Sequence, residues 1–187
     1  MRKKPAFYKH PKAVVEKGSV VGAGTKIWAF AHVQKGAKIG ANCNICNNCY
    51  IESGAVVGNG VTIKNNVSVW EGVKIQDKVF VGPDVVFTND LFPRSRVPDW
   101  ELARTLIMKG ATIGANATLL SNISVGKRAL VGAGSVVTSS IGNHGLVYGN
   151  PGKEAGKVCA CARRLKKRGK VWICVRCKKQ YKNKDFA

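Results

Sequence analysis

The sequence predicts an all-β fold, a parallel β-solenoid, and three regularities of spacing predict it. An aliphatic residue occupies every sixth position from Val15 to Val81, and the same stride resumes from Ile107 to Val137. Glycine, asparagine or aspartate, which tolerate the positive φ of a tight corner, follows most stride positions by three residues. A small or β-branched side chain follows by four. Each hexad is therefore a short extended segment and a corner, with two inward positions.

Stacked hexads would bury their aliphatic residues in one continuous column. Gly18, Gly36, Gly54 and Gly72 recur every eighteen residues, which three hexads per coil explain. The eighteen hexads then give about six coils. At roughly 4.8 Å between paired strands, the prism would be about 30 Å tall. A sandwich of short strands also uses many glycine turns, but it predicts irregular spacing rather than an unbroken six.

A break in the stride lies between Phe87 and Ile107. The gap of twenty residues is not a multiple of six, so the segment 88–106 must leave the coil as a loop. Long polar loops on a rigid scaffold often hold binding groups, although a solvated insertion without a role would show the same pattern.

The positive charge is concentrated in the last part of the chain. The formal net charge is +21, and residues 157–187 hold twelve Lys or Arg against one acidic residue, Asp185. A basic surface can bind nucleic acid or an anionic membrane, or it can steer polyanionic substrates; a genome-wide lysine bias would also produce it. Because no nucleic-acid reading motif accompanies the charge, we do not expect a nucleic-acid partner.

The chain carries no apolar run that is long enough to cross a membrane. The basic start, Met1 to Lys4, is not followed by an apolar segment of the signal-peptide type. We therefore expect a cytoplasmic protein without membrane insertion.

Seven cysteines fall into two groups. Cys43, Cys46 and Cys49 lie within the repeats, where Cys43 and Cys49 take the small inward position and are expected to pack as small hydrophobes. The second group is spaced Cys-x-Cys, twelve residues, Cys-x-x-Cys, and comprises Cys159, Cys161, Cys174 and Cys177.

The second group has the count and loop length of a structural zinc site with four thiolates. The sequence thus predicts a solenoid domain over 1–156 and a basic, zinc-ribbon-like tail over 157–187. Glycines that zinc knuckles favour are replaced by Ala162 and Lys178. Two disulfides or free thiols therefore remain alternatives to zinc.

Three segments carry a resemblance to a known family. They read Ile-Trp-Ala-Phe-Ala-His-Val at 27–33, Lys-Asn-Asn-Val-Ser-Val-Trp-Glu-Gly-Val at 64–73, and Phe-Thr-Asn-Asp-Leu-Phe-Pro-Arg-Ser at 87–95. From about residue 14 to 153 the chain resembles the hexapeptide-repeat acyltransferases, whose fold is a left-handed parallel β-helix. Within them it looks like the N-acetyltransferases that act on the 3-amino group of a UDP-linked 2-acetamido-3-amino-2,3-dideoxyglucuronic acid. It departs from many relatives at Ala29, where they have histidine, and at Trp70, where they have tyrosine.

The resemblance implies an enzyme that makes a surface polysaccharide of the O-antigen type. The sugar amine would attack the thioester of acetyl-CoA, which requires alignment, a neutral amine and support for the oxyanion. Asn89, whose amide can both donate and accept hydrogen bonds, and Glu71 and His32, as candidate bases, are the expected catalytic residues. Glu71 and His32 are also compatible with ordinary solvated corner positions.

The expected substrate-binding residues are Asn89, Asp90, Arg94, Lys64 and Asn65. Asp90 is a further candidate base. The planar fork of Arg94 suits a uronic carboxylate or a phosphate. A surface arginine on a solvated loop would present the same residue.

Coenzyme A is expected along one corner of the second run of repeats. Gly-Ala-Asn at 114–116 and Gly-Ala-Gly-Ser at 132–135 place Ala115 and Ala133 one eighteen-residue coil apart. The resemblance implies contacts from Ala115, Ala133 and Thr138 to the pantetheine arm, and from Lys153 to the phosphates. It also implies a homotrimer, since the family binds its cofactor between neighbouring subunits.

Three other functions are alternatives to this one. A transferase for another nucleotide-linked amino sugar would share the chemistry. A β-helical zinc hydratase needs converging histidines, but only His10, His32 and His144 are present, and two of them lie outside the repeats. A non-enzymatic adaptor with a nucleic-acid-binding zinc tail is the third alternative.

Overall fold

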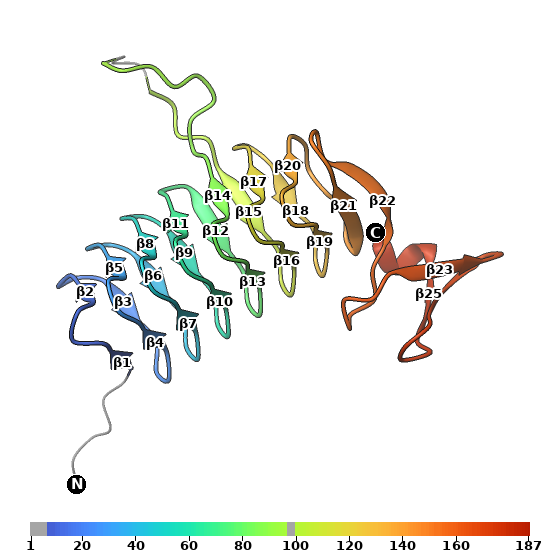
Figure 1. The fold of residues 1–187 in the computed structure, drawn as a ribbon, viewed down its shortest axis with the longest axis horizontal. Helices are drawn as coiled ribbons and strands as arrows, with labels where there is room; N and C mark the ends of the chain where they lie inside the picture. Colours follow the sequence, from blue (N-terminus) through green and yellow to red (C-terminus); the bar gives the residue numbers. More distant parts are fainter. Residues whose placement is uncertain (1–6, 97–99) are drawn as a thin grey trace, which may run out of the picture.

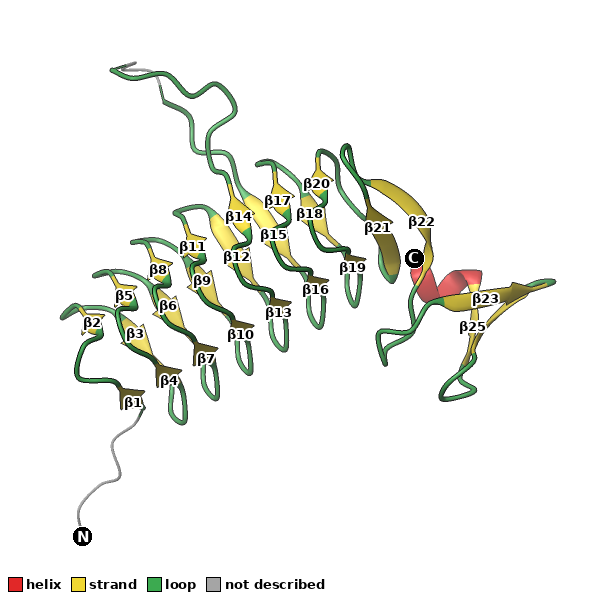
Figure 2. Ribbon diagram, in the orientation of Figure 1, coloured by secondary structure: helices red, strands yellow, loops and turns green. Residues whose placement is uncertain are grey.

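The computed structural model describes residues 7–96 and 100–187. Short strands stack coil on coil into a three-faced solenoid, and a small ribbon follows its last coil (Figure 1). Figure 2 shows that strands and turns make up the solenoid and that a helical segment lies in the tail. The predicted all-β, parallel solenoid is confirmed.

Each face of the solenoid is a sheet of very short strands. The nine-stranded face contains β1 (Tyr8–Lys9), β4 (Lys26–Ile27), β7 (Asn44–Ile45), β10 (Thr62–Ile63), β13 (Phe80–Val81), β16 (Thr112–Ile113), β19 (Leu130–Val131), β21 (Gly145–Tyr148) and β22 (Lys153–Lys157). The seven-stranded face contains β2 (Val14–Val15), β5 (His32–Val33), β8 (Tyr50–Ile51), β11 (Ser68–Val69), β14 (Val86–Phe87), β17 (Thr118–Leu119) and β20 (Val136–Val137). The six-stranded face contains β3 (Val20–Val21), β6 (Lys38–Ile39), β9 (Val56–Val57), β12 (Val73–Ile75), β15 (Thr105–Ile107) and β18 (Ser124–Val125).

The number of coils exceeds the predicted six. Eight strands of the nine-stranded face run parallel, from β1 to β21, so the solenoid has about eight turns. The stride missed the ends because Lys9 occupies the expected aliphatic place in β1. At the other end, Val147 of β21 lies ten residues after Val137 rather than six or twelve.

The core is the column that the stride predicts. Ile27, Ile45 and Ile63 occupy successive coils in direct register, and each is fully buried. The corners turn through positive φ at the predicted glycines and asparagines. Phe30, Lys78 and Arg128 adopt the same conformation, with φ of 60°, 57° and 56°, although their side chains disfavour it.

Three corners join the faces, and each is named here by one residue. The Ala115 corner joins the nine-stranded to the seven-stranded face and contains 64–66, 82–84, 114–116 and 132–134. The Asn89 corner joins the seven-stranded to the six-stranded face and contains 70–72, the loop after Phe87 and 138–140. The Lys109 corner joins the six-stranded to the nine-stranded face and contains 76–78, 108–110, 126–128 and 142–144.

The tail forms a three-stranded antiparallel ribbon from β23 (Leu165–Arg168), β24 (Val171–Cys174) and β25 (Gln180–Lys182), followed by the 3-10 helix η1 (Asn183–Phe186). The strand β22 crosses the domain boundary that was predicted between 156 and 157. That boundary remains a prediction. Within the described ranges, no helix has the length and apolar character that a membrane span needs.

Candidate functional site

The extruded loop leaves the solenoid at the Asn89 corner, between β14 and β15 (Figure 1). Its outgoing end is held by Trp70, whose Nε1 donates to the carbonyl oxygen of Phe87 at 2.9 Å. Its two sides are tied together because Ala103 N donates to Asn89 O at 3.0 Å. Part of the predicted loop, residues 97–99, lies outside the described residues.

Two predicted catalytic residues, Asn89 and Glu71, meet at the base of this loop. The Nδ2 of Asn89 donates to the backbone carbonyl oxygen of Glu71 at 3.3 Å, and the Glu71 side chain is exposed. Gly72 has a φ of +82°, and a Cβ there would lie 3.0 Å from Cδ1 of Leu102. Glycine therefore permits both the turn and the close return of the loop.

A cavity of about 410 Å³ opens between the two sides of the loop. Asp90 and Arg94 line it, together with Trp100 and Arg104. Asp90 is oriented by an Asx turn, since its Oδ1 accepts the N–H of Phe92 at 2.8 Å. With Glu101, the site combines an apolar wall with two carboxylates and two guanidinium groups, and the guanidinium groups can pair with anionic groups of a polar ligand.

The predicted coenzyme A residues Ala115 and Ala133 lie on successive coils of the Ala115 corner. Gly134 N donates to Ala115 O at 2.8 Å, which fixes this stacking. A Cβ at Gly114 would lie only 2.5 Å from Ala133 N, so the coils approach as closely as glycine permits. Lys64 and Asn65 occupy the same corner on a lower coil.

Of the other two predicted cofactor residues, one lies at a different corner and one lies above the Ala115 corner. Thr138 follows β20 at the Asn89 corner, and it is exposed. Lys153 is paired with Tyr148 at the end of β21, above the Ala115 corner, and is also exposed. The predicted site residues are therefore divided between two corners of one chain.

His32 lies on the seven-stranded face, three strands below β14, and does not join Asn89 and Glu71. Its Nε2 is 2.6 Å from Oε1 of Glu16. Two hydrogen bonds to the Glu16 carboxylate lower its pKa. The bond from the Lys35 N–H has the larger effect, and the bond to His32 has the smaller one. Sequence reasoning missed Glu16, although the eighteen-residue repeat aligns it with Gln34, two residues from His32.

Glu16 also belongs to a structural ladder. Glu16, Gln34 and Glu52 each accept a backbone N–H from the coil above, from Lys35, Ser53 and Glu71 respectively. The carboxylate beside His32 is thus part of the corner framework, and it fixes the imidazole in place.

The four tail cysteines converge, and their Sγ atoms all lie within 4.8 Å of one another. The Sγ separations are 3.5 Å for Cys159–Cys177 and 3.5 Å for Cys161–Cys174. A disulfide needs about 2.05 Å, whereas tetrahedral zinc with bonds of about 2.3 Å separates its sulfurs by about 3.8 Å. The thiols thus fit a tetrahedral metal better than two disulfides.

The residues that follow the cysteine pairs adopt the knuckle conformation without glycine. Ala162 has a φ of 60° and Lys178 a φ of 61°. Their N–H groups donate to Cys159 O at 2.8 Å and to Cys174 O at 3.0 Å. The cysteines within the repeats are buried, and burial raises the pKa of Cys49 to about 12, as expected for an inert core thiol.

Comparisons with known proteins agree with this architecture. The family of bacterial transferase hexapeptides (six repeats) matches residues 18–53 and 104–139, and the hexapeptide repeat of succinyl-transferase matches 36–71. The repeats and the fold thus define a hexapeptide-repeat β-solenoid protein. The matched repeats are thus similar to those of bacterial hexapeptide transferases, in agreement with the resemblance predicted from the sequence.

One curated relative is the dTDP-3-amino-3,6-dideoxy-α-D-galactopyranose 3-N-acetyltransferase of Aneurinibacillus thermoaerophilus. It is 48% identical over 82 residues, which cover 44% of this chain and 42% of the relative. The serine acetyltransferase of Buchnera aphidicola is 37% identical over 90 residues, 47% of this chain and 30% of that protein. The matched segments thus span less than half of these relatives' lengths.

Solved structures show the same fold. A putative acetyltransferase of Bacillus cereus has a TM-score of 0.62 at 19% identity, over 83% of this chain and 86% of that one. The acetyltransferase domain of PglB from Neisseria gonorrhoeae, in complex with acetyl coenzyme A, has a TM-score of 0.53 at 21% identity, over 80% and 57%.

Proposed function

We propose that this protein is an acetyl-CoA-dependent N-acetyltransferase that acts on the amino group of a nucleotide-linked sugar. The observation that carries the proposal is the 48% identical segment shared with a sugar-nucleotide 3-N-acetyltransferase. The more specific proposal is the 3-amino group of UDP-2-acetamido-3-amino-2,3-dideoxyglucuronic acid, for surface polysaccharide. The relative is named for a dTDP-linked sugar without a carboxylate, and we assign the preference for a uronic acid to the loop that carries Arg94.

In the proposed reaction, the sugar nitrogen attacks the thioester carbonyl carbon. The C–N bond forms, the C–S bond breaks, and one amine proton must leave while the thiolate of coenzyme A gains one. The amide of Asn89 would orient the amine or the acetyl group, and Arg94 would pair with the sugar carboxylate or a phosphate. Glu71 or Asp90 at the loop, or His32 from another copy, would receive the proton.

The division of the site between two corners favours a shared site in a homotrimer. The seven-stranded face separates the Ala115 corner from the Asn89 corner. Its outward positions carry neither Lys nor Arg in a chain with 31 of them: Val14, His32, Tyr50, Ser68, Val86, Thr118 and Val136. Packing this face against a second copy would bring one chain's Ala115 corner toward the neighbour's Asn89 corner.

Two valines test this assembly because they are similar in exposure and differ in face. Val86 on the seven-stranded face is 47% exposed, and Val20 on the six-stranded face is 58% exposed. Val86→Arg should shift the protein from trimer to monomer in light scattering, because a charge would be buried in the contact. Val20→Arg should leave the mass unchanged. Equal behaviour of the two variants would contradict the proposed contact.

The activity is tested by thiol release from acetyl-CoA with a panel of acceptors. UDP-2-acetamido-3-amino-2,3-dideoxyglucuronic acid is compared with the matching sugar without the carboxylate, with a dTDP-linked 3-amino sugar and with a 4-amino sugar. Preference for the uronic acid supports the specific substrate. Turnover of only another amino sugar keeps the reaction and removes that substrate, whereas no turnover of any acceptor contradicts the proposed function.

We further propose that the tail binds one structural Zn²⁺ through Cys159, Cys161, Cys174 and Cys177. The support is the convergence of their four Sγ atoms within 4.8 Å. Zinc would contribute folding free energy to the tail, as it does in other small four-thiolate modules.

A further inference from the structure

The Lys109 corner concentrates positive charge on successive coils. Gly110 N donates to Asp77 O at 2.9 Å, and Arg128 N donates to Lys109 O at 3.0 Å. These bonds place Lys109 one coil above Lys78 and one coil below Lys127. Neighbouring coils are only about 4.8 Å apart, so the backbone positions that carry these cations lie close together.

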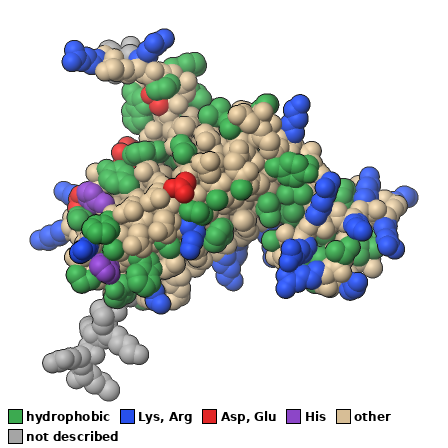
Figure 3. Space-filling view, viewed as in Figure 1, with side chains coloured by type: hydrophobic (Ala, Val, Ile, Leu, Met, Phe, Trp, Pro, Cys, Tyr) green, Lys and Arg blue, Asp and Glu red, His purple; other side chains and the backbone are tan. Residues whose placement is uncertain are grey.

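The stems of two of these long side chains lie along this corner. A Cβ at Gly110 would be 3.4 Å from Cγ of Arg128, and one at Gly60 would be 3.7 Å from Cγ of Lys78. The stems of Arg128 and Lys78 therefore cover the glycine of the coil below. Figure 3 shows further Lys and Arg side chains over the adjoining ribbon.

The corner and the tail enclose a cavity of about 380 Å³. Lys78, Lys109, Lys127 and Arg128 line it from the solenoid, and Asp185 and Ala187 line it from the tail. The tail is fixed there because Asn143 Nδ2 donates to the carbonyl oxygen of Ala187 at 2.8 Å. The cations thus face a built concave site rather than a flat surface.

The nearby carboxylates neutralise these cations only in part, because Asp185 is the one carboxylate side chain among the described residues that line the cavity. Over residues 7–96 and 100–187, the ion pairs are His32–Glu16 and Lys157–Glu154. Asp77 accepts the backbone N–H of Asn59 at 2.8 Å, and Asp185 accepts that of Lys182 at 2.7 Å. Four cations and one carboxylate side chain therefore share the cavity, and the repulsion of the excess positive charge would be relieved by a bound anion.

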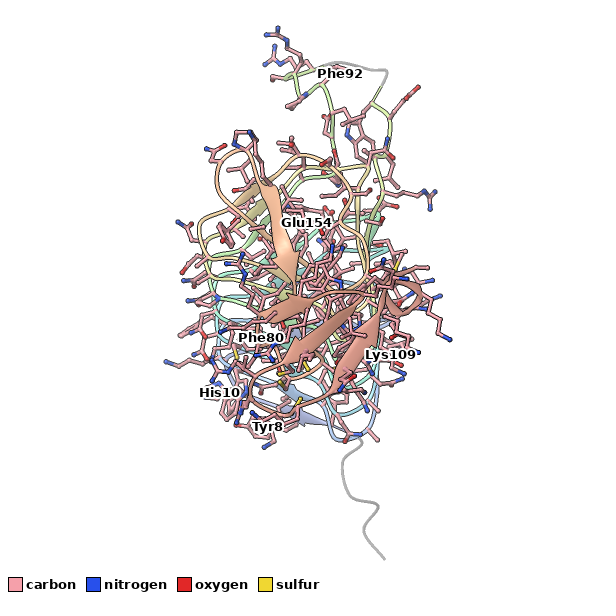
Figure 4. The ribbon with its side chains drawn as sticks, turned by 90° about the vertical axis from the view of Figure 1, so that its right-hand side faces the viewer. Tyr8, His10, Phe80, Phe92, Lys109 and Glu154 are labelled. Atoms are coloured by element: carbon pink, nitrogen blue, oxygen red, sulfur yellow. The ribbon has the colours of Figure 1, made fainter. Side chains whose placement is uncertain are left out.

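We propose that the Lys109 corner is a second anion site, which binds the phosphate groups of a small molecule such as a nucleoside diphosphate. Lysine ammonium groups bind phosphate as point charges, and the Arg128 guanidinium adds a bidentate fork. The tail forms one wall of the cavity, and a volume of about 380 Å³ favours a small molecule over a polymer. Figure 4 shows Lys109 on a different side of the solenoid from the loop that carries Phe92, so this site is distinct from the proposed transferase site.

Calorimetry on the full chain tests the proposal with pyrophosphate and UDP as probes, each with and without saturating coenzyme A. The wild type should bind one pyrophosphate per chain in the presence of coenzyme A. The double variant Lys109→Ala/Lys127→Ala should bind it about 10- to 100-fold more weakly, because it loses two charge-assisted contacts. The control Lys26→Ala/Lys38→Ala removes the same charge from exposed positions on β4 and β6 and should bind within about twofold of the wild type.

Three results would overturn the second site: no pyrophosphate binding by the wild type, equal loss in both double variants, or displacement of pyrophosphate by coenzyme A. Tighter binding of UDP than of pyrophosphate would identify a nucleoside diphosphate, and equal binding would identify phosphate alone. The proposal is separate from the transferase activity, so Lys109→Ala/Lys127→Ala should keep the acetyl-transfer rate of the wild type.

Discussion

The solenoid and the tail reach a folded state in different ways. The solenoid buries a long column of aliphatic residues, among them Ile27, Ile63 and Ile113, which are fully buried. The core of the ribbon consists of Cys159, Leu165, Cys174 and Tyr181, half of which are thiols. A core of this size cannot stabilise a module of about thirty residues without a metal or a docking surface. Repetition therefore stabilises one region, whereas the other needs a metal or a docking surface.

The largest expected effect is the loss of the ribbon when its proposed zinc site is removed. Cys159→Ser/Cys174→Ser should abolish zinc binding and unfold β23 to β25, because structural zinc contributes about 10 to 16 kcal/mol of apparent binding free energy. Zinc stoichiometry by atomic emission and hydrogen exchange of the ribbon measure this. Cys46→Ser, at a buried thiol of the solenoid, is the control and should retain one zinc. Full zinc content in the double variant would contradict the proposed zinc site.

The solenoid should instead depend on apolar volume. Ile63→Ala should destabilise it by about 2 to 5 kcal/mol, because a cavity would open in the central column. The outward neighbour Thr62 is half-buried, and Thr62→Ala should change stability by about 0.5 kcal/mol or less. Urea unfolding followed by circular dichroism measures both. Similar losses of stability in the two variants would show that the buried aliphatic column does not dominate the stability of the solenoid.

The ribbon knuckles offer a smaller effect of opposite sign. Ala162→Gly and Lys178→Gly should each stabilise the ribbon by about 0.5 to 1 kcal/mol, since glycine adopts positive φ without the cost that a Cβ adds. Ala160→Gly is the control; Ala160 is not among the positive-φ residues, so its replacement should destabilise. Hydrogen exchange of the ribbon at constant zinc concentration compares the stability of the three variants. Weaker protection in either knuckle variant than in the wild type would contradict the prediction.

The smallest expected effect is a pH dependence at the junction of the two regions. Nδ1 of His144 in the solenoid donates to Val158 O at 2.7 Å, and the His144 ring lies 5.2 Å from that of Tyr181. Because a carbonyl oxygen only accepts, Nδ1 carries the proton. Burial lowers the pKa of His144 below its usual 6.5. The unfolded chain then binds the proton first as pH falls, so this stabilisation is complete above pH 6.5 and is lost as pH falls through the folded-state pKa.

His144→Asn keeps a side-chain donor toward Val158 and does not titrate near neutral pH. The protection of the ribbon should therefore fall less between pH 7.5 and pH 5.5 in this variant than in the wild type. The cysteines titrate in both proteins, so their contribution cancels in the difference. Identical slopes would exclude His144 as the source.

The fold was predictable because the same six-residue pattern recurs along most of the solenoid. The stride failed only where the rule is broken by Lys9, by the loop after Phe87 and by the shifted Val147. The loop itself was predictable from that break. Positive φ at Ala162 and Lys178 was not, because glycine is the residue that normally marks it.

Parts of the site that depend on register across the loop could not be predicted. Lys78 and Lys109 are 31 residues apart. They occupy neighbouring coils of one corner because the loop between them leaves the solenoid. The Asn89–Glu71 contact and the Glu16–His32 pair likewise join different coils. The division of predicted site residues between the Ala115 and Asn89 corners became apparent only when strands were assigned to faces.

Complementation between two variants tests most directly whether the transferase site is shared between copies. Ala133→Trp should block the Ala115 corner, and Asn89→Ala should disable the loop, so each homotrimer should be inactive. In randomly mixed trimers, one junction in four would combine two intact corners, and acetyl transfer should recover to about a quarter of the wild-type rate. No recovery in mixed trimers that are shown to form by co-purification would contradict a site built from two chains.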